Sequence, residues 1–247
     1  MPIPCYLAMT QDEFATNSAL PPHTAWLSCH FSSLNQGLSN LPQELPEDSV
    51  LIVDDFLPPC GHDPRLIAHQ LSETFNCPIL LDFQKSGNPE TEDMAAALAE
   101  LLPDRICVSD IYAQALHCPV FLPPLPPDMP LETHISPWQN REIWLDISWT
   151  PIQLRITREG CFQEEGHFFS PSELPHRNPD LNCSYTTAIL DDSILFTLCR
   201  TAEDISALLH KAERYGVTRA LGLFQEWQKE STLPKQGAFE QTRYEGN

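Results

Sequence analysis

Short apolar runs alternate with amphipathic segments through the first two thirds of the chain, and this alternation limits the folds available to it. Runs of about four to eight apolar residues between turn residues are typical of buried parallel strands. Strands that alternate with helices predict βα units around a parallel sheet. The expected strands are Pro4–Met9, Ala25–Phe31, Val50–Phe56, Pro78–Phe83, Arg105–Ser109, Pro119–Leu122 and Glu142–Ile147.

Two helices can be placed between these strands. Asp63 is a suitable N-cap and Pro64 suits the first helical position, so a helix is expected from there to about Phe75. A second helix is expected from about Thr91 to Leu102, with acidic residues at its positive end. The length of 247 residues is typical of a single α/β barrel.

The pattern changes after Thr150. Apolar and polar residues alternate from Ile152 to Thr157, and a turn at 158–160 leads into Cys161–Glu165, which predicts a β-hairpin. A second hairpin is expected from Ser184–Leu190 and Ser193–Arg200, with a Pro-rich loop over 167–182 between the two. A helix over Ala202–Tyr215 and a last strand over Arg219–Glu226 follow.

These elements predict an α/β fold, a (β/α)8 TIM-type barrel with a small antiparallel β insertion before the last strand. Residues 1–228 are expected to form the barrel, with 150–199 as the β-hairpin insertion and 229–247 as a polar C-terminal tail.

The charge balance excludes some partners. A net charge of −20 disfavours nucleic acid and anionic membrane surfaces. No apolar run could span a bilayer, and no basic segment followed by an apolar segment opens the chain, so a cytoplasmic location is expected. The 9 Cys include no Cys-x-x-Cys pair and there is no Gly-rich phosphate loop, so neither a metal nor a cofactor is expected. The sequence does not indicate an oligomeric state.

Carboxylates recur just after the apolar runs. They are Asp54, Asp55, Asp82, Asp110, Asp146 and Glu226. The strands of a barrel all end at one mouth, where such side chains converge and can raise one another's pKa. The alternative for any single Asp is that it caps the following helix or turn.

The run from Cys77 to Gln84 resembles the fourth-strand signature of the family 18 glycoside hydrolases, Asp-x-x-Asp-x-Asp-x-Glu. The four signature positions fall on Cys77, Leu80, Asp82 and Gln84. The segment 200–224 is similar to the closing helix and eighth strand of that family, with Phe224 near the place of its aromatic floor. The resemblance, which covers about residues 48–228, implies a sugar-binding barrel whose general acid is the last Glu. Only Asp82 is retained, and an amide stands at the acid position.

Three functions follow. The prediction is a catalytically inactive barrel that binds a carbohydrate or similar polar ligand, because Gln84 has no titratable proton to donate. The alternatives are an active glycosidase in which Asp82 works with Asp110 or Glu226, and a protein-interaction scaffold. Ligand contacts are expected from charged and polar residues and from rings that can stack on a sugar, namely His30, Asp54, Asp55, Phe56, Tyr112, Asp146, Trp149 and Phe224. For most of the rings, core packing is the alternative.

Overall fold

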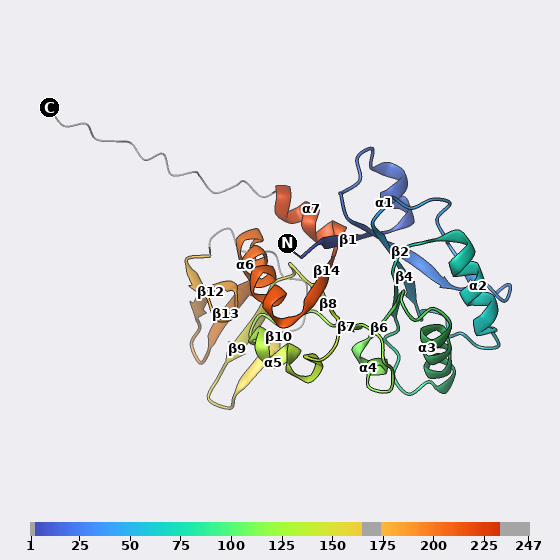
Figure 1. The fold of residues 1–247 in the computed structure, drawn as a ribbon. Coiled ribbons are helices and arrows are strands. Elements are labelled where there is room, and N and C mark those ends of the chain that lie inside the picture. Colours follow the sequence, from blue (N-terminus) through green and yellow to red (C-terminus); the bar gives the residue numbers. More distant parts are fainter. Residues whose placement is uncertain (1–2, 165–173, 233–247) are drawn as a thin grey trace.

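A computed structural model describes residues 3–164 and 174–232, and its main feature is a closed parallel barrel (Figure 1). The closed order is β1-β14-β8-β7-β6-β5-β4-β2, and β2 pairs with β1. The strands are β1 (Cys5–Met9), β2 (Thr24–Phe31), β4 (Ser49–Asp54), β5 (Ile79–Asp82), β6 (Ile106–Ser109), β7 (Val120–Leu122), β8 (Ile143–Ile147) and β14 (Val217–Leu223). The short β3 (Leu38–Ser39) adds to β2 in antiparallel fashion. The expected TIM-type barrel is confirmed.

Helices connect most of the strands. They are α1 (Gln11–Thr16), α2 (Pro64–Thr74), α3 (Pro89–Leu101), α4 (Asp110–Ala113), α5 (Leu131–Ile135), α6 (Ala202–Ala212) and α7 (Phe224–Thr232). Asp63 caps α2 as expected, and its side chain accepts a bond from the backbone N–H of Arg65. Asn88 caps α3 in the same way, so this helix begins two residues earlier than expected. Helices as short as α1, α4 and α5 carry too few turns to show a 3.6-residue period.

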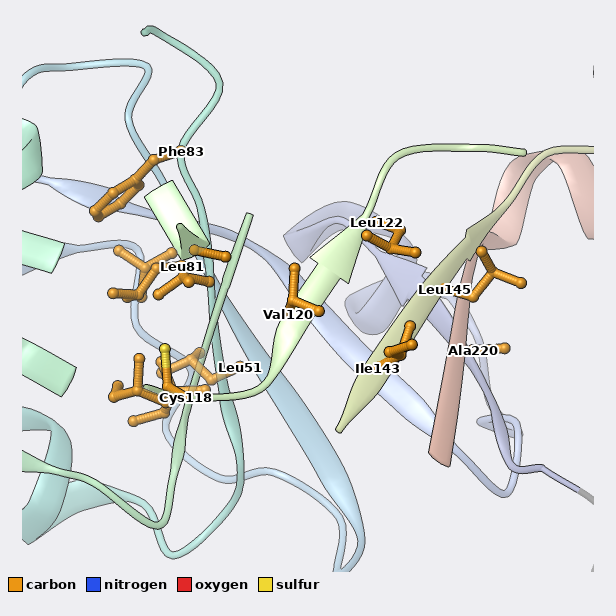
Figure 2. Packing of buried hydrophobic residues seen from close by; sticks show 14 of the residues in the cluster. Leu51, Leu81, Phe83, Cys118, Val120, Leu122, Ile143, Leu145 and Ala220 are labelled. Carbon is orange, nitrogen blue, oxygen red and sulfur yellow. The ribbon is translucent and has the colours of Figure 1, made fainter. Parts of the chain in front are cut away.

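The strands bury side chains on both faces, which gives the barrel two hydrophobic layers. The inner layer contains Tyr6, Ile52, Leu80 and Trp144, and every buried residue in it comes from a strand. The outer layer packs the other strand face against the helices, and Figure 2 shows part of it, including Leu81 on β5, Val120 on β7 and Leu145 on β8. Successive side chains of a strand point to opposite faces, so the residue two positions after an inner one also points inward.

The insertion is a five-stranded antiparallel sheet in the order β10-β9-β13-β12-β11. Its strands are β9 (Ile152–Ile156), β10 (Cys161–Glu164), β11 (His176–Asn178), β12 (Cys183–Ile189) and β13 (Ile194–Cys199). Both expected hairpins are present. β11 lies where a loop was expected, because three polar residues carry no apolar alternation. Glu165 and the part of that loop up to residue 173 lie outside the described residues.

The last strand is shorter than expected. Pairing to β1 and β8 stops by Leu223, and Phe224 begins α7 instead of continuing the strand to Glu226. The backbone partners run out at this point, because β8 ends at Ile147 and the register places that residue opposite Gly222. Helix α7 includes residues 229–232, at the start of the expected tail, and residues 233–247 lie outside the described part of the chain.

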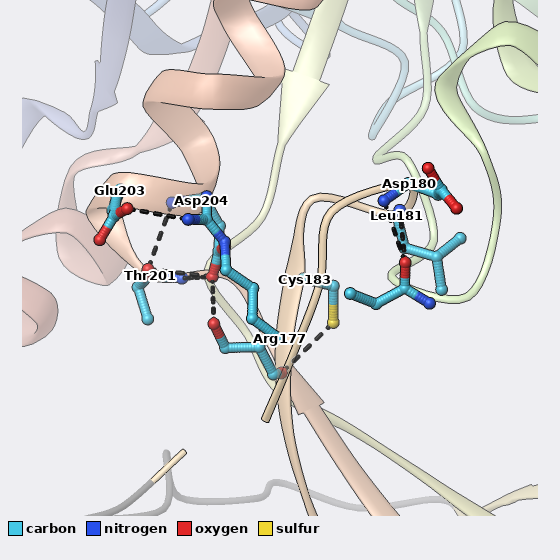
Figure 3. A network of polar contacts seen from close by, with 9 residues as sticks. Arg177, Asp180, Leu181, Cys183, Thr201, Glu203 and Asp204 are labelled. Carbon is cyan, nitrogen blue, oxygen red and sulfur yellow. Dashed lines mark hydrogen bonds and ion pairs between the residues drawn. The ribbon is translucent and has the colours of Figure 1, made fainter. Parts of the chain in front are cut away.

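A buried carboxylate attaches the insertion to the barrel. Asp204 is fully buried in the first turn of α6, where it accepts bonds from the Ser184 hydroxyl (2.7 Å) and the Arg177 Nε (2.8 Å). Its carboxylate also completes a capping box with Thr201. Figure 3 shows Arg177, on β11, reaching Asp204 and the exposed Glu203. Because a buried charge is costly without partners, this network fixes the sheet against α6.

Replacing Arg177 with Ala should therefore lower the free energy of unfolding by about 2–3 kcal/mol, since Asp204 loses its charged partner while remaining buried. Glu203→Gln is the matched control, because it removes only the exposed half of the same arginine contact, worth less than about 1 kcal/mol. Urea denaturation of the three proteins measures both values. Equal losses in the two variants would contradict the assigned role of Asp204.

Candidate functional site

Three carboxylates point into the barrel at its carboxyl-terminal mouth. Asp54 and Asp82 are register partners at the ends of β4 and β5. Asp146 lies near the end of β8, and each of the three follows an inner-layer residue by two positions, after Ile52, Leu80 and Trp144. Strand alternation therefore turns all three toward the barrel axis. The sequence predicted that six carboxylates converge, and these three form an acidic mouth.

Burial and neighbouring negative charges raise the pKa values of this cluster. Burial and the charges of Asp82 and Glu226 raise the pKa of Asp146 to about 7. Burial also raises the pKa of Asp82, against the lowering effect of hydrogen bonds from Gln84 and Ser109. The pKa of Asp54 is raised by burial too, while a bond from the Phe56 N–H and the nearby His30 oppose the shift. The mouth can thus both donate and accept hydrogen bonds at neutral pH.

Polar side chains surround the carboxylates. His30 lies opposite Asp54 in the β2–β4 register. The Gln84 side-chain amide donates to Asp82 Oδ1, and the Ser109 hydroxyl approaches the same oxygen at 3.3 Å. Sequence reasoning missed Ser109, although a hydroxyl at the end of the strand next to Asp82 is a usable signal. Asp82 is therefore oriented from two sides.

Asp55 points the other way and organises the loops behind the site. It is 4% exposed, and its carboxylate accepts bonds from the backbone N–H groups of Gln84 (3.1 Å) and Lys85 (3.0 Å). The Lys85 Nζ returns a bond to each of the Asp55 and Phe56 carbonyls at 2.8 Å. Asp55 was expected to contact a ligand, but its oxygens already position the segment that carries Gln84.

The two other expected acids occupy different places. Glu226, in the first turn of α7, accepts bonds from the Thr150 hydroxyl (2.6 Å) and the Trp149 N–H (2.8 Å), so it fixes the chain that leaves β8. Its charge still reaches Asp146. Asp110 begins α4 directly after β6, and its charge acts on His134.

Three of the four expected aromatic contacts lie in the outer hydrophobic layer instead. Tyr112, Trp149 and Phe224 are 7%, 7% and 4% exposed, and all three belong to the outer cluster. The Trp149 ring packs so closely over Gly222 that a Cβ there would lie 2.5 Å from a ring carbon. These residues lie beyond the ends of β6, β8 and β14, where strand alternation no longer sets the direction of a side chain. Phe56 and Trp227, at 75% and 42% exposed, remain as rings that a ligand can reach.

Similarity to solved structures is confined to the fold. No protein-family model matches the sequence, and no curated protein matches it significantly. A chitinase from Chromobacterium violaceum superposes with a TM-score of 0.55 at 9% identity, covering 89% of this chain and 93% of that chain. A family 18 N-acetylglucosaminidase from Paenibacillus barengoltzii gives 0.55 at 9% identity, covering 89% and 94%. The Bacillus cereus spore cortex-lytic enzyme SleL gives 0.54 at 8% identity, covering 94% and 71%.

The chain therefore has a chitinase-like barrel, as the fourth-strand resemblance implied. Among residues 3–164 and 174–232, no group of three or more His, Cys, Asp or Glu side chains is placed to hold a metal ion. No helix in these ranges has the length and apolar character needed to cross a bilayer.

The raised pKa of Asp146 has a measurable effect on stability. Between about pH 4 and pH 7 the folded state keeps a proton that the unfolded chain has lost, so stability falls as pH rises through this window. Asp146→Asn removes this titration. The difference in free energy of unfolding between the variant and wild type should grow in favour of the variant by about 2–3 kcal/mol as pH rises from 5 to 8. Denaturation at several pH values measures the gap, with the exposed Asp180→Asn as control. A gap independent of pH would show that Asp146 titrates normally.

Proposed function

We propose that this barrel binds a carbohydrate or similar polar ligand at its acidic mouth without hydrolysing it. The observation that carries the proposal is the hydrogen bond from the Gln84 amide to Asp82 at the end of the fourth barrel strand. At the Gln84 position, the family 18 resemblance implies a general acid. The amide keeps the hydrogen bond to Asp82 but supplies no transferable proton, so the site can recognise a glycan and lacks that catalytic group.

The position of the Pro-rich segment after β7 supports a binding mouth over a pure interaction scaffold. Leu125 is buried in the outer layer, and Arg200, directly after β13, donates to the carbonyls of Leu125 and Pro126. These contacts hold the segment against the insertion sheet. A segment packed across the barrel axis would instead have favoured the scaffold.

The charge of the mouth favours one ligand class. Asp54, Asp82 and Asp146 face inward, and the chain as a whole carries a net charge of −20. Neutral and amine-bearing sugars should therefore bind better than phosphorylated or sulfated ones. Phe56 and Trp227 offer rings on which a sugar could stack.

A second candidate is hydrolysis with a relocated acid. Asp146, with its pKa of about 7, fits this role better than Asp110 or Glu226, because it is protonated near neutral pH and its charge is coupled to Asp82. Glu226 already accepts bonds from the chain that leaves β8.

We expect no turnover of chromogenic N-acetylglucosamine oligomers by the wild-type chain. Gln84→Glu alone should not create activity, because Cys77 and Leu80 also depart from the signature. Release of the chromophore is followed by absorbance, with Asp146→Asn assayed in parallel. Robust hydrolysis by wild type that Asp146→Asn abolishes would replace the proposal with the relocated-acid mechanism.

Glycan binding should depend on the mouth. In calorimetric titrations of neutral and amine-bearing oligosaccharides, Asp82→Asn should cost about 1.5–3 kcal/mol of binding free energy through a lost charge-assisted hydrogen bond. Phe56→Ala should cost about 1 kcal/mol through a lost stacking surface. The controls are Asp180→Asn and Phe162→Ala, which remove an exposed acid and an exposed ring on the insertion. If no glycan binds, or if both mouth variants bind like wild type, the barrel does not use this mouth for sugar.

A further inference from the structure

A cavity lies at the end of the barrel opposite the acidic mouth. Its volume is about 710 Å³, and it is lined by residues 43–49, residues 74–78 and Arg219. The first two segments lead into β4 and β5, so the cavity opens at the amino-terminal end of these strands, away from the acidic mouth. A space of this size could hold a small organic ligand.

Hydrogen bonds fix one wall of this cavity, the segment that leads into β4. The Ser49 side chain is fully buried, and its hydroxyl donates to the Pro46 carbonyl at 2.7 Å. Asp48 accepts a bond from the Tyr6 hydroxyl at 2.7 Å and lies 2.9 Å from His23 Nδ1. Because these partners belong to β1, β4 and the approach to β2, the wall is part of the barrel framework.

The wall that leads into β5 is fixed by an arginine. The Arg105 guanidinium donates to the Phe75 carbonyl at 2.7 Å and to the Cys77 carbonyl at 3.0 and 3.1 Å. These bonds hold the backbone between α2 and β5. Both walls are therefore preformed, which reduces the entropy cost of binding a ligand between them.

The cavity is lined by charges of both signs. Arg219 projects from β14, which is separated from β4 by β1 and β2 in the barrel order, so its side chain reaches toward the cavity from across the barrel floor. The guanidinium lies 4.8 Å from the centre of the Trp144 ring and pairs with Glu142 through Nη1 at 2.6 Å. Because a guanidinium has five N–H donors, it can also donate hydrogen bonds to a further anionic partner.

The lining segment before β4 supplies the opposite charge. Glu44 and Glu47 are exposed residues of this segment. A purely anionic ligand would meet these two carboxylates, and a purely cationic ligand would meet Arg219.

We propose that this cavity binds a small zwitterion, with its carboxylate on Arg219 and its ammonium group near Glu44 and Glu47. Free amino acids and short peptides with both termini unblocked share this chemistry. The proposal is independent of sugar binding at the mouth, because the two sites use different residues at opposite ends of the barrel.

Nuclear magnetic resonance titration of the full chain tests the proposal through the Trp144 indole N–H, which donates to Glu142 beside Arg219. The probes are glycine, triglycine, N-acetyltriglycine and triglycine amide. Saturable shifts of the Trp144 indole N–H resonance are expected with glycine or triglycine. The probe with the higher affinity shows whether the cavity prefers a free amino acid or a peptide. If triglycine binds more tightly than glycine, then N-acetyltriglycine and triglycine amide should each bind at least tenfold more weakly than triglycine. No saturable shift with either unblocked probe, or equal affinity for blocked and unblocked peptides, overturns the proposal.

Variants give an independent test. Glu44→Gln with Glu47→Gln should weaken binding of the unblocked probe at least tenfold, and Arg219→Gln should abolish it. Asp180→Asn with Asp191→Asn removes the same number of charges from exposed loops of the insertion and should bind like wild type. If Arg219→Gln fails to fold, the glutamate pair still decides, because its residues are exposed. Wild-type affinity in the glutamate variant overturns the proposal, whatever the outcome of glycan titrations at the mouth.

Discussion

Closure of the sheet by β1 is the constraint on which the rest of the structure depends. This strand pairs with β14 on one side and with β2 on the other, so chain segments more than 200 positions apart lie side by side. A closed sheet leaves no unpaired edge in the barrel, and it gives every strand an inner and an outer face. The inner face is narrow and is filled by strand side chains alone, including Tyr6 and Trp144. The polar residues at the strand ends are consequently brought to two small openings.

The two openings differ in chemistry because different ends of the same strands meet there. At the carboxyl ends, Asp54, Asp82 and Asp146 follow inner-layer residues, and burial with mutual repulsion raises their pKa values. At the amino ends, Arg219 precedes the inner-layer residue Leu221, and its charge is balanced by Glu142. One barrel thus carries an acidic, partly protonated mouth and a floor with paired charges. We propose a neutral or amine-bearing glycan for the mouth and a ligand that carries both signs for the floor.

The insertion extends the barrel without entering its sheet. Its two hairpins were visible in the sequence as alternating apolar and polar residues, but their attachment was not. Asp204 is an ordinary capping residue in the sequence, and only the fold buries it between Arg177 and Ser184. The same holds for Glu226, which was expected to be a candidate acid and instead fixes the chain leaving β8.

Local sequence determined the strands, the main helices and their order, because apolar period, caps and prolines act over a few residues. It also determined that carboxylates would follow several strands, and that an amide would stand where the family 18 resemblance implies an acid. Tertiary structure decided which of those side chains face the axis. Asp54 and Asp55 are neighbours in the chain, yet one points into the mouth and the other into the loop behind it, because successive strand residues alternate between faces. Tyr112, Trp149 and Phe224 could be placed in the outer layer only once the strand ends were fixed by pairing with neighbours distant in sequence.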